Sequence, residues 1–485
     1  MNARLTPGSL ITLPAHVRRP AYDRARLQSG IVHIGPGAFH RAHQAQLIDD
    51  ILETDPRWGI DVIALRSRET LDALRAQGGL FTLKRLQADT QTRVIGSIRR
   101  AFGSQQDPWG TMMALAGPQT RLITLTVTEK GYCLTPDGAL DLTHRDIIHD
   151  LVHPATPRSA PGWLVAALAR RRSAGIAAPV ILSCDNLEDN GHKLARAVIT
   201  LARQTDPDLA GWIEARVLFP RSMVDSITPA SDPAFLDAVE AELGVRDEAA
   251  VQREGFTSWV IEAADAEPLR VLGQAGAVLT HDVEGHALIK LRVLNGAHSA
   301  LAWTGLAMGH SSVADAMGDD WLRADTEALI REDILPGLTA PDGLDLQAYA
   351  ASVLTRFANR SIVHLLSQIA WDSSQKLPVR LLGTLEANLA AGRPVERLSR
   401  AIAAWMRFVV RSARLGASLN DPLAEDLFAA AHTCTDDPDG DTTRFLALRS
   451  IFSAGLAQHP HFRTAVSRGY RDMLDLERGV RPAQI

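Results

Sequence analysis

Lys290, Asn295 and His298 lie within one short stretch of the sequence. A neutral lysine can accept a proton, an amide can donate a hydrogen bond to a reacting oxygen, and a histidine can orient that oxygen. On an α-helix at ~100° per residue, the three side chains fall within an arc of about 140°. One helical face can therefore present all three to one pocket. The group predicts a carbonyl–alcohol conversion that needs no metal ion.

Each of these residues also has an ordinary structural alternative. A lysine on a helix commonly extends along the surface into solvent, and a lone histidine is more often an interior residue with satisfied hydrogen bonds. Burial of Lys290 against apolar neighbours would favour its neutral amine and let it act as a base. The catalytic interpretation therefore rests on the grouping of the three residues.

The first part of the chain alternates short apolar runs with helical patterns. We predict strands at 31–34, 60–65, 121–127 and 180–183, accompanied by helices such as 162–172 and 192–203. This alternation is typical of a parallel sheet with helices on both faces. Ligands of such sheets bind at the carboxyl ends of the strands, so the residues that follow each strand are candidates for a site.

A glycine-containing turn follows the first predicted strand. Gly35 and Gly37, with Ala38 and Phe39 at the start of a predicted helix, form half of a dinucleotide-binding fingerprint. Small residues there let the backbone approach a pyrophosphate at a helix N-terminus. The third glycine is absent because position 40 is His. Taken alone, the pattern is equally compatible with a plain strand–helix turn.

The second predicted strand ends near Arg66, Arg68 and Glu69. An acid at this place binds the adenosine ribose of NAD, whereas a base accommodates the additional phosphate of NADP. Glu69 favours NAD, the arginines leave NADP open, and a surface charge pair at a helix start is the structural alternative.

Polar residues also follow the third and fourth predicted strands. Thr128 and Glu129 follow the third strand, and Asn186 follows the fourth. Asn186 could polarise a carbonyl or could cap the next helix. Asp225 lies in a segment predicted to be irregular, where it could bind a sugar hydroxyl or pair with Arg221.

The composition excludes several classes of function. The net charge of −5 argues against nucleic acid or an anionic membrane as the main partner. No run of about 18 apolar residues occurs, so no membrane span is predicted. The three cysteines are far apart and form no C-x-x-C pair. With no secretion signal at the N-terminus, we predict a cytoplasmic protein.

The 485 residues are too many for one ordinary core. Strand-like runs nearly vanish after about residue 285. We therefore predict an α/β fold in which a Rossmann-type N-terminal domain, 1–285, is followed by a mainly α-helical C-terminal domain, 286–485. The predicted helices of the second domain are 285–310, 318–336, 345–356, 359–371, 395–415, 421–433, 442–457 and 461–478.

These features match one family in order along the chain. The sequence resembles the long-chain mannitol 2-dehydrogenase family, which also contains fructuronate reductase, or D-mannonate oxidoreductase. The matching segments are residues 34–44, 126–132, 183–186, 223–225, 290–298 and 375–380. The resemblance implies a Rossmann-type domain followed by a helical domain, and zinc-independent hydride transfer.

The resemblance also implies roles for individual residues. Lys290 would be the general base, Asn186 and Asn295 would hold the reacting oxygen, and His298 would contact a substrate hydroxyl. The remaining assignments place substrate contacts at Asp225, Glu129 and Lys376, and the acid that selects NAD at Glu69.

The chain departs from the family pattern at several positions. Many members have a glutamate three residues before the lysine, but this chain has Ala287, so Glu284 or His286 is a candidate replacement in the proton route. Gln368 stands where some polyol-specific members have an arginine, and Arg360 replaces a proline near the substrate region.

We therefore predict an NAD-dependent oxidoreductase, NADP not being excluded, that acts at C2 of an open-chain six-carbon sugar. Fructuronate and mannonate are slightly preferred on the overall similarity of the sequence. Arg360, Lys376 and Arg380 could bind a carboxylate, although Lys376 belongs to both substrate groups. The alternative is a mannitol 2-dehydrogenase or related polyol dehydrogenase, acting on mannitol and fructose or on arabinitol. A remote alternative is a non-catalytic NAD-binding sensor. The predicted partner is a small sugar, polyol or sugar acid, no metal site is expected, and a monomer is compatible with the sequence.

Overall fold

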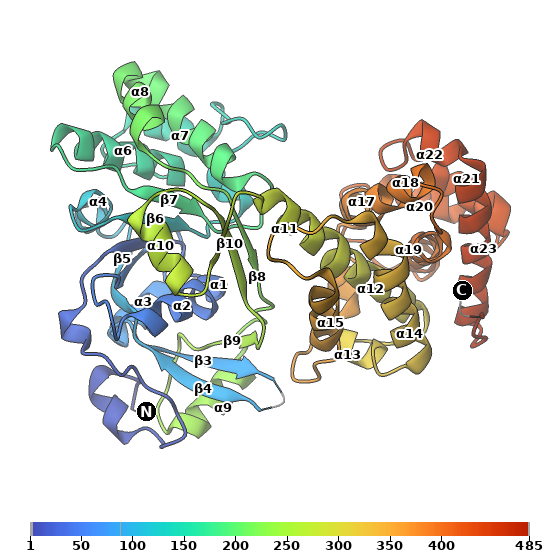
Figure 1. The fold of residues 1–485 in the computed structure, drawn as a ribbon, viewed down its shortest axis with the longest axis horizontal. Helices are drawn as coiled ribbons and strands as arrows, with labels where there is room; N and C mark the ends of the chain where they lie inside the picture. The colour runs from blue at the N-terminus through green and yellow to red at the C-terminus, as the bar shows by residue number, and fades with distance from the viewer. Residues whose placement is uncertain (1–2, 88, 484–485) are drawn as a thin grey trace. The chain divides into compact units, whose positions relative to one another are not determined.

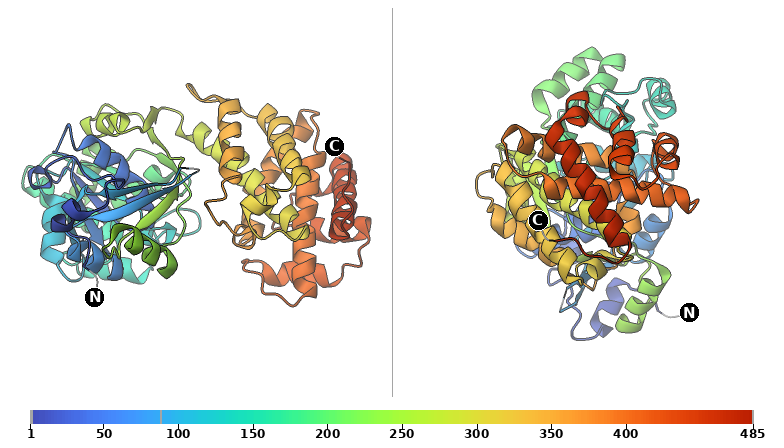
Figure 2. Two further views of the ribbon diagram at one scale, coloured as in Figure 1. Left: turned by 90° about the horizontal axis from the view of Figure 1, so that it is seen from below. Right: turned by 90° about the vertical axis from the view of Figure 1, so that its right-hand side faces the viewer.

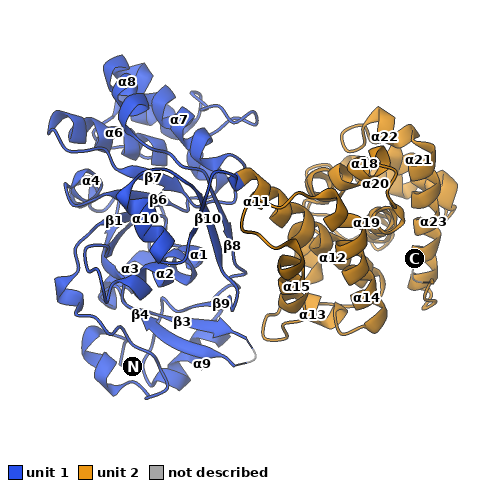
Figure 3. Cartoon of the chain, in the orientation of Figure 1, with its two compact units in different colours: residues 1–283 blue, residues 284–485 orange. Residues whose placement is uncertain are grey.

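The protein is described here by a computed structural model in which residues 3–87 and 89–483 are placed. The chain forms two compact units, Met1–Val283 and Glu284–Ile485. Figures 1 and 2 show the ribbon, and Figure 3 colours the two units separately.

Unit 1 is built around a five-stranded parallel sheet (Figure 1). Its strands, in spatial order, are β5 (Ile98–Gly103), β2 (Ile60–Ala64), β1 (Ile31–Ile34), β6 (Leu122–Leu125) and β7 (Val180–Ser183). Every residue of β1, β2, β6 and β7 is buried, as expected for a parallel sheet covered on both faces. The order reverses direction between β1 and β6, which is the switch point where such sheets bind ligands. The predicted fold class is confirmed.

Successive residues of β1 enter two different cores. Ile31 packs with helices α1 (Ala38–Ala42), α2 (Gln44–Ile51), α3 (Glu69–Ala76) and α10 (Glu267–Gln274). Val32 and Ile34 pack on the opposite face, against helices α4 (Pro108–Ala116), α6 (Ala160–Ser173), α7 (Asn190–Thr205) and α8 (Pro207–Arg216). This alternation follows from the two-residue period of a strand.

Several strands of unit 1 escaped the sequence prediction. Strand β5 has an arginine pair, Arg99 and Arg100, that hides its apolar pattern. The Arg100 guanidinium pairs at 2.6 Å with Asp61, a fully buried acid on β2. Two small sheets complete the unit. One contains β4 (Gln91–Ile95), β3 (Phe81–Leu86) and β9 (Val251–Glu254), and the other contains β11 (Val278–Thr280), β10 (Ser258–Glu262) and β8 (Ser222–Asp225).

The expectation of an irregular segment around Asp225 was wrong, because Asp225 is the last residue of β8. Its neighbour across the antiparallel pair with β10 is Ser258. Polar residues at both ends of this short strand removed the apolar run that would have revealed it. Arg221, the suggested partner of Asp225, forms an ion pair with Glu262 at 2.8 Å.

Unit 2 is helical, as predicted. Its longest helices are α12 (Ala297–Ala307), α15 (Leu346–Phe357), α19 (Glu396–Arg414) and α23 (Pro460–Glu477). The shorter ones are α11 (Val283–Ile289), which begins at the unit boundary, α13 (Val313–Ala316), α14 (Asp320–Ala328), α16 (Leu366–Ile369), α17 (Ser373–Leu377), α18 (Gly383–Ala390), α20 (Ala424–His432), α21 (Pro438–Leu446) and α22 (Ala454–Gln458).

Two predicted helices of unit 2 were partly wrong. Residues 359–365 are not helical, because their backbone pairs with a neighbouring segment: Val313 N–H donates to His364 O and Leu366 N–H donates to Ser311 O. The predicted helix 442–457 is divided into α21 and α22, since Ser453 caps the N-terminus of α22. Helices α13, α17 and α18 were missed.

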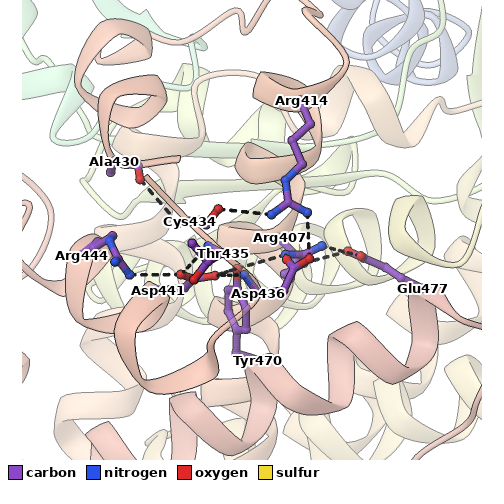
Figure 4. Close-up of polar contacts among 10 residues, drawn as sticks. All are labelled: Arg407, Arg414, Ala430, Cys434, Thr435, Asp436, Asp441, Arg444, Tyr470 and Glu477. Carbon is purple, nitrogen blue, oxygen red and sulfur yellow. Dashed lines mark hydrogen bonds and ion pairs between the residues drawn. The ribbon is translucent and has the colours of Figure 1, made fainter. Parts of the chain in front are cut away.

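A buried ionic network joins the last helices of the chain (Figure 4). Arg407 of α19 bonds Glu477 of α23 at 2.6 Å, Asp436 at 2.5 Å and the Tyr470 hydroxyl at 3.0 Å. Asp441 accepts hydrogen bonds from the backbone N–H groups of residues 435 and 436 and from Tyr470. Helix α23, red in Figure 2, thus packs against α19 and fixes the end of the chain.

Among the described residues, no helix is both long enough and apolar enough to cross a membrane. In the same part of the chain, no three His, Cys, Asp or Glu side chains are grouped as a metal site would require.

Candidate active site

The turn after β1 requires glycine at one of its two glycine positions. Gly35 has φ +99°, and a Cβ built there would lie 2.1 Å from the Thr126 carbonyl oxygen. A side chain at Gly37 would meet nothing closer than 3.9 Å. Gly35 is thus required by the close approach of β1 and β6. Gly37, at the N-cap of α1, leaves free backbone surface beside Ala38 and Phe39.

A histidine pair takes the place of the missing third glycine. His40 is buried on α1, and its ring stacks on that of His33 with the centroids 3.5 Å apart. His33 contacts the Thr124 hydroxyl at 2.7 Å and the Gly35 carbonyl at 2.9 Å. Burial lowers the pKa of His33 to about 3 and that of His40 well below its usual value. The helix therefore packs on the sheet through two neutral, stacked rings.

The acid and the base at the end of β2 have different surroundings. Glu69 is the first residue of α3 and is exposed. Arg66 pairs at 2.6 Å with Asp146, whose side chain is almost buried. Arg66 therefore pairs with Asp146 of α5 (Arg145–Val152) and not with Glu69.

Three candidate residues after β6 and β7 are exposed at the carboxyl edge of the sheet. Thr128, Glu129 and Asn186 belong to this group. Asn186 does not cap the next helix, since the N-cap of α7 is Asp189. The structural alternative proposed for Asn186 is therefore wrong. Asp225, at the end of β8, is buried.

Unit 2 carries Lys290 and Asn295 on a π-helix rather than on an α-helix. The segment Lys290–Gly296 is π-wound and continues directly from α11 into α12. Hydrogen bonds of a π-helix join residues five apart. Asn295 is therefore about one turn above Lys290, on the same side of the helix, rather than about 140° around it. The expectation of a regular α-helix was wrong here, and the π-turn brings the two side chains into closer alignment.

A second π-segment, Pro378–Leu382, packs against the first. A Cβ at Gly296 would lie 2.9 Å from the Arg380 carbonyl oxygen, so only glycine permits this approach. The Arg380 guanidinium donates to the Ser299 hydroxyl at 2.9 Å. The Lys290–Gly296 helix and the Gln375–Arg380 stretch are thus joined by backbone contact and by a side-chain hydrogen bond.

His298 is buried in an aromatic and cationic environment. Its ring stacks on Phe357 and meets His364 edge-on, with centroids 4.9 and 4.7 Å apart. Burial, followed by the electrostatic effects of His364, Arg380, Arg356 and Lys376, holds the pKa of His298 well below its usual value. His298 is therefore neutral near pH 7, and its buried Nε2 is left without a hydrogen-bond partner among the described residues.

Two cations beside His298 have no carboxylate partner. Arg380 bonds Ser299, and the Lys376 ammonium donates to the Ile369 carbonyl at 3.3 Å. No carboxylate within the placed part of the chain forms an ion pair with either. Burial lowers the pKa of Arg380 to about 10, and burial followed by the charge of Arg380 lowers the pKa of Lys376. Positive charge at a partly desolvated site of this kind favours an anion.

Other predicted residues lie at the margin of this group. Gln368 is exposed on α16. Arg360 is exposed, and its guanidinium lies near Gly318, between α13 and α14. Of the two candidates for the proton route, Glu284 is exposed, whereas His286 is buried one helical turn before Lys290.

Sequence reasoning missed Phe357, His364 and Arg356 as neighbours of His298. No local pattern distinguishes them, because they approach from α15 and from the non-helical segment that follows it. The segment 359–365 was predicted to be helical, which would have turned His364 to a different side.

The doubly wound sheet, the glycine turn at its switch point and the polar residues at its carboxyl edge define a Rossmann-type oxidoreductase. Residues 29–271 match the family model of the mannitol dehydrogenase Rossmann domain, and residues 282–474 match that of the mannitol dehydrogenase C-terminal domain. The chain therefore belongs to the mannitol dehydrogenase family.

Individual relatives agree with this assignment. D-mannonate oxidoreductase of Escherichia coli (strain K12) is 40% identical over 474 residues, which cover 96% of this chain and 97% of that protein. A crystal structure of substrate-free D-sorbitol dehydrogenase has a TM-score of 0.90 and 30% identity, covering 99% and 100% of the two chains. Pseudomonas fluorescens mannitol 2-dehydrogenase, in a ternary complex with NAD and D-mannitol, has a TM-score of 0.80 and 34% identity, covering 98% and 99%.

Proposed function

We propose that the protein interconverts the C2 ketone and secondary alcohol of an open-chain six-carbon sugar with NAD, and that fructuronate and mannonate are its preferred pair. In this proposal unit 1 binds NAD and unit 2 supplies the base and the substrate carboxylate site. The observation that carries the substrate preference is a pair of cations beside neutral His298, Arg380 and Lys376, which hydrogen-bond Ser299 and the Ile369 carbonyl but form no ion pair with a carboxylate within the placed part of the chain.

The choice of NAD rests on the turn after β1 and on the end of β2. Gly35, Gly37 and the following residues Ala38 and Phe39 leave backbone exposed at the switch point of the sheet, and Glu69 is free in solvent to accept ribose hydroxyls. Arg66, which could have favoured a phosphate, forms an ion pair with Asp146. The solved mannitol 2-dehydrogenase of Pseudomonas fluorescens is a complex with NAD. When bound, NAD supplies the hydride chemistry.

The proposed proton chemistry uses Lys290. In the oxidative direction its neutral amine takes the proton of the C2 hydroxyl, and in reduction its ammonium returns it. Asn295, aligned with Lys290 by the π-turn, and Asn186 donate amide hydrogens to the same oxygen, which stabilises developing negative charge. His298, which is neutral and whose buried Nε2 lacks a hydrogen-bond partner among the described residues, is proposed to hydrogen-bond a substrate hydroxyl. Thr128, on the cofactor side, and Glu129 and Asp225, on the substrate side, complete the proposed contacts.

His286 is the better candidate to connect Lys290 with solvent. It lies four residues before Lys290, hence on the same helical face, and it is buried. Glu284 lies six residues away and is exposed. We therefore propose that His286 replaces the glutamate that many family members have at the position of Ala287.

A carboxylate distinguishes the two substrate classes. Arg380 can form two parallel hydrogen bonds to a carboxylate, and Lys376 can add a third. A polyol offers hydroxyls alone and supplies neither cation with an ion-pair partner. The alternative, a mannitol 2-dehydrogenase, is supported by the solved relative with D-mannitol. A non-catalytic sensor would bind NADH but turn over neither class.

The test is a substrate panel with purified protein, using fructuronate and fructose with NADH and with NADPH, each with and without EDTA. We expect the largest kcat/KM for fructuronate with NADH, and no loss with EDTA. Arg380→Gln should lower kcat/KM for fructuronate about 100-fold, because charge-assisted bonds contribute roughly 1.5–3 kcal/mol. Its effect on fructose should be far smaller.

Arg449→Gln, at an exposed arginine of the same unit, is the matched control and should leave kcat/KM unchanged for both substrates. A higher kcat/KM for fructose, together with equal losses on both substrates in Arg380→Gln, would reject the sugar-acid preference and support the polyol alternative. Inactivation by EDTA would reject the metal-free mechanism.

A further inference from the structure

One carboxylate, that of Asp185, joins the loops that follow the two adjacent strands β6 and β7. It accepts hydrogen bonds from the backbone N–H groups of Val127 and Thr128, both at 2.9 Å. It also accepts from the Tyr132 hydroxyl at 2.6 Å. Asp185 immediately precedes Asn186, so the residue that binds the β6 loop is next to a proposed oxyanion donor.

Thr128 has a conformation that a threonine rarely adopts. Its φ is +66° and its ψ is 163°, a region that is essentially restricted to glycine and costs about 1–3 kcal/mol for other residues. Such a conformation persists where the surroundings over-determine it. Here the Thr128 N–H is held by Asp185, and the Thr128 carbonyl accepts from Gly131 N–H at 2.9 Å.

Asp185 is itself held from the interior of unit 1. Tyr132 is fully buried, and its hydroxyl also lies 2.6 Å from that of Ser183. The buried Asn190 amide donates to the Asp185 carbonyl at 3.1 Å and to the Ser222 carbonyl at 2.9 Å. Burial raises the pKa of the Asp185 carboxyl, while its three donors oppose that rise. The side chain is thus fixed between the core and the exposed loops.

We propose that Asp185 is a positioning residue, which holds Thr128 in its strained conformation and thereby places the exposed residues Thr128, Glu129 and Asn186 for ligand binding. The effect on ligands rests on the proposed function, whereas the effect on the loop does not. The exposed residues need such a fixed point, because little packing surrounds them.

The test uses Asp185→Asn, which keeps the shape but replaces one accepting oxygen by a donor. We expect the dissociation constant of NADH and the KM of the sugar to rise at least tenfold, more than kcat falls, and the melting temperature to decrease by several degrees. Asp189→Asn is the matched control. Asp189 lies in the same loop but pairs with His192 and Arg196. This change should therefore leave the dissociation constant of NADH, the KM and the melting temperature unaltered.

A second substitution separates positioning from general stability. Glycine adopts a positive φ without strain, so adding Thr128→Gly to Asp185→Asn should recover the KM at least threefold and raise the melting temperature. Adding Thr128→Ala instead removes the same side chain without relieving the strain and should recover neither. The proposal is overturned if Asp185→Asn leaves NADH binding and melting unchanged, or if glycine and alanine act alike.

These outcomes are independent of the substrate assignment. If the wild-type protein turned over no sugar, the proposed function would fail. The melting temperatures and the NADH dissociation constants of the four variants would still test the role of Asp185.

Discussion

The two units hold their candidate site residues by different means. In unit 1 Thr128, Glu129 and Asn186 lie on exposed turns after buried strands, and backbone geometry shapes these turns: Gly35 admits the Thr126 carbonyl, and Asp185 binds two backbone N–H groups. In unit 2 Lys290, Asn295 and His298 lie on a continuous helix, and the side-chain environment sets their properties: His298 is enclosed by rings and cations. Unit 1 therefore presents backbone groups to a ligand, whereas unit 2 sets the protonation and hydrogen bonding of individual side chains.

Both units nevertheless depend on one glycine that a neighbouring carbonyl oxygen makes necessary. The contact is between Gly35 and Thr126 in unit 1, and between Gly296 and Arg380 in unit 2. Gly35 also has a positive φ, whereas Gly296 has the helical φ of −64°. The turn in unit 1 is thus constrained twice, and the helix in unit 2 once.

The largest expected effect tests whether Lys290, in unit 2, is the general base. Lys290→Met should lower kcat about 1,000-fold, because general-base catalysis contributes typically 10²–10⁴-fold. The dissociation constant of NADH, measured by fluorescence titration, should change less than threefold. Lys193→Met, on α7 of unit 1, is the control for loss of a lysine. A Lys290→Met enzyme that retained a third of its turnover would show that the base lies elsewhere.

The next effect tests whether the backbone of unit 1 requires glycine at position 35. Gly35→Ala should reduce the stability of unit 1 by about 3 kcal/mol, because it combines a strained φ with overlap against a carbonyl. Gly37→Ala, two residues on, meets no atom within 3.9 Å and should leave the melting temperature unchanged. It should weaken NADH binding, because the added methyl obstructs the approach of a pyrophosphate. Equal melting temperatures for the two variants would contradict the comparison.

A third prediction concerns a feature that the two units share, a buried neutral histidine. The pKa of His33 is about 3 in the folded protein, against about 6.5 in an unfolded chain. The folded pKa is depressed, so the unfolded state binds the proton first and stability is lost as pH falls below about 6.5. At pH 5 the loss from His33 alone is about 2 kcal/mol.

Urea unfolding midpoints at pH 7.5 and pH 5 measure this loss. In His33→Gln the decrease between the two pH values should be smaller than in the wild-type protein. His16→Gln, at an exposed histidine, should leave the decrease unaltered. An unchanged pH dependence in His33→Gln would show that His33 is already protonated, or is not buried, in the folded state.

The smallest expected effect tests the cofactor side of unit 1. Glu69→Gln should lower the preference for NADH over NADPH about tenfold, since hydrogen bonds to a charged carboxylate contribute roughly 1.5–3 kcal/mol and an amide retains part of that. The ratio of kcat/KM for the two cofactors measures it. Glu53→Gln, an exposed acid at the end of α2, is the control. A ratio that did not move would leave Glu69 without a role in cofactor choice.

Local patterns in the sequence predicted much of the fold. Four buried strands, the parallel sheet and the helical character of unit 2 followed from apolar runs and their periodicity, because strands covered on both faces are apolar throughout. Strand β5 and Asp225 at the end of β8 were missed, since their charged residues are compensated by partners distant in sequence, such as Asp61 for Arg100.

The sequence by itself determined which chemical groups are available: a lysine, two amides, a histidine and a glycine turn after an apolar strand. The tertiary structure alone decided the π-winding that aligns Lys290 with Asn295, the strained Thr128 held by Asp185 after the adjacent strand, and the burial that, together with nearby cations, keeps His298 neutral. The physical reason is that each of these depends on contacts between distant segments, where desolvation and close packing act, and no local period records such contacts.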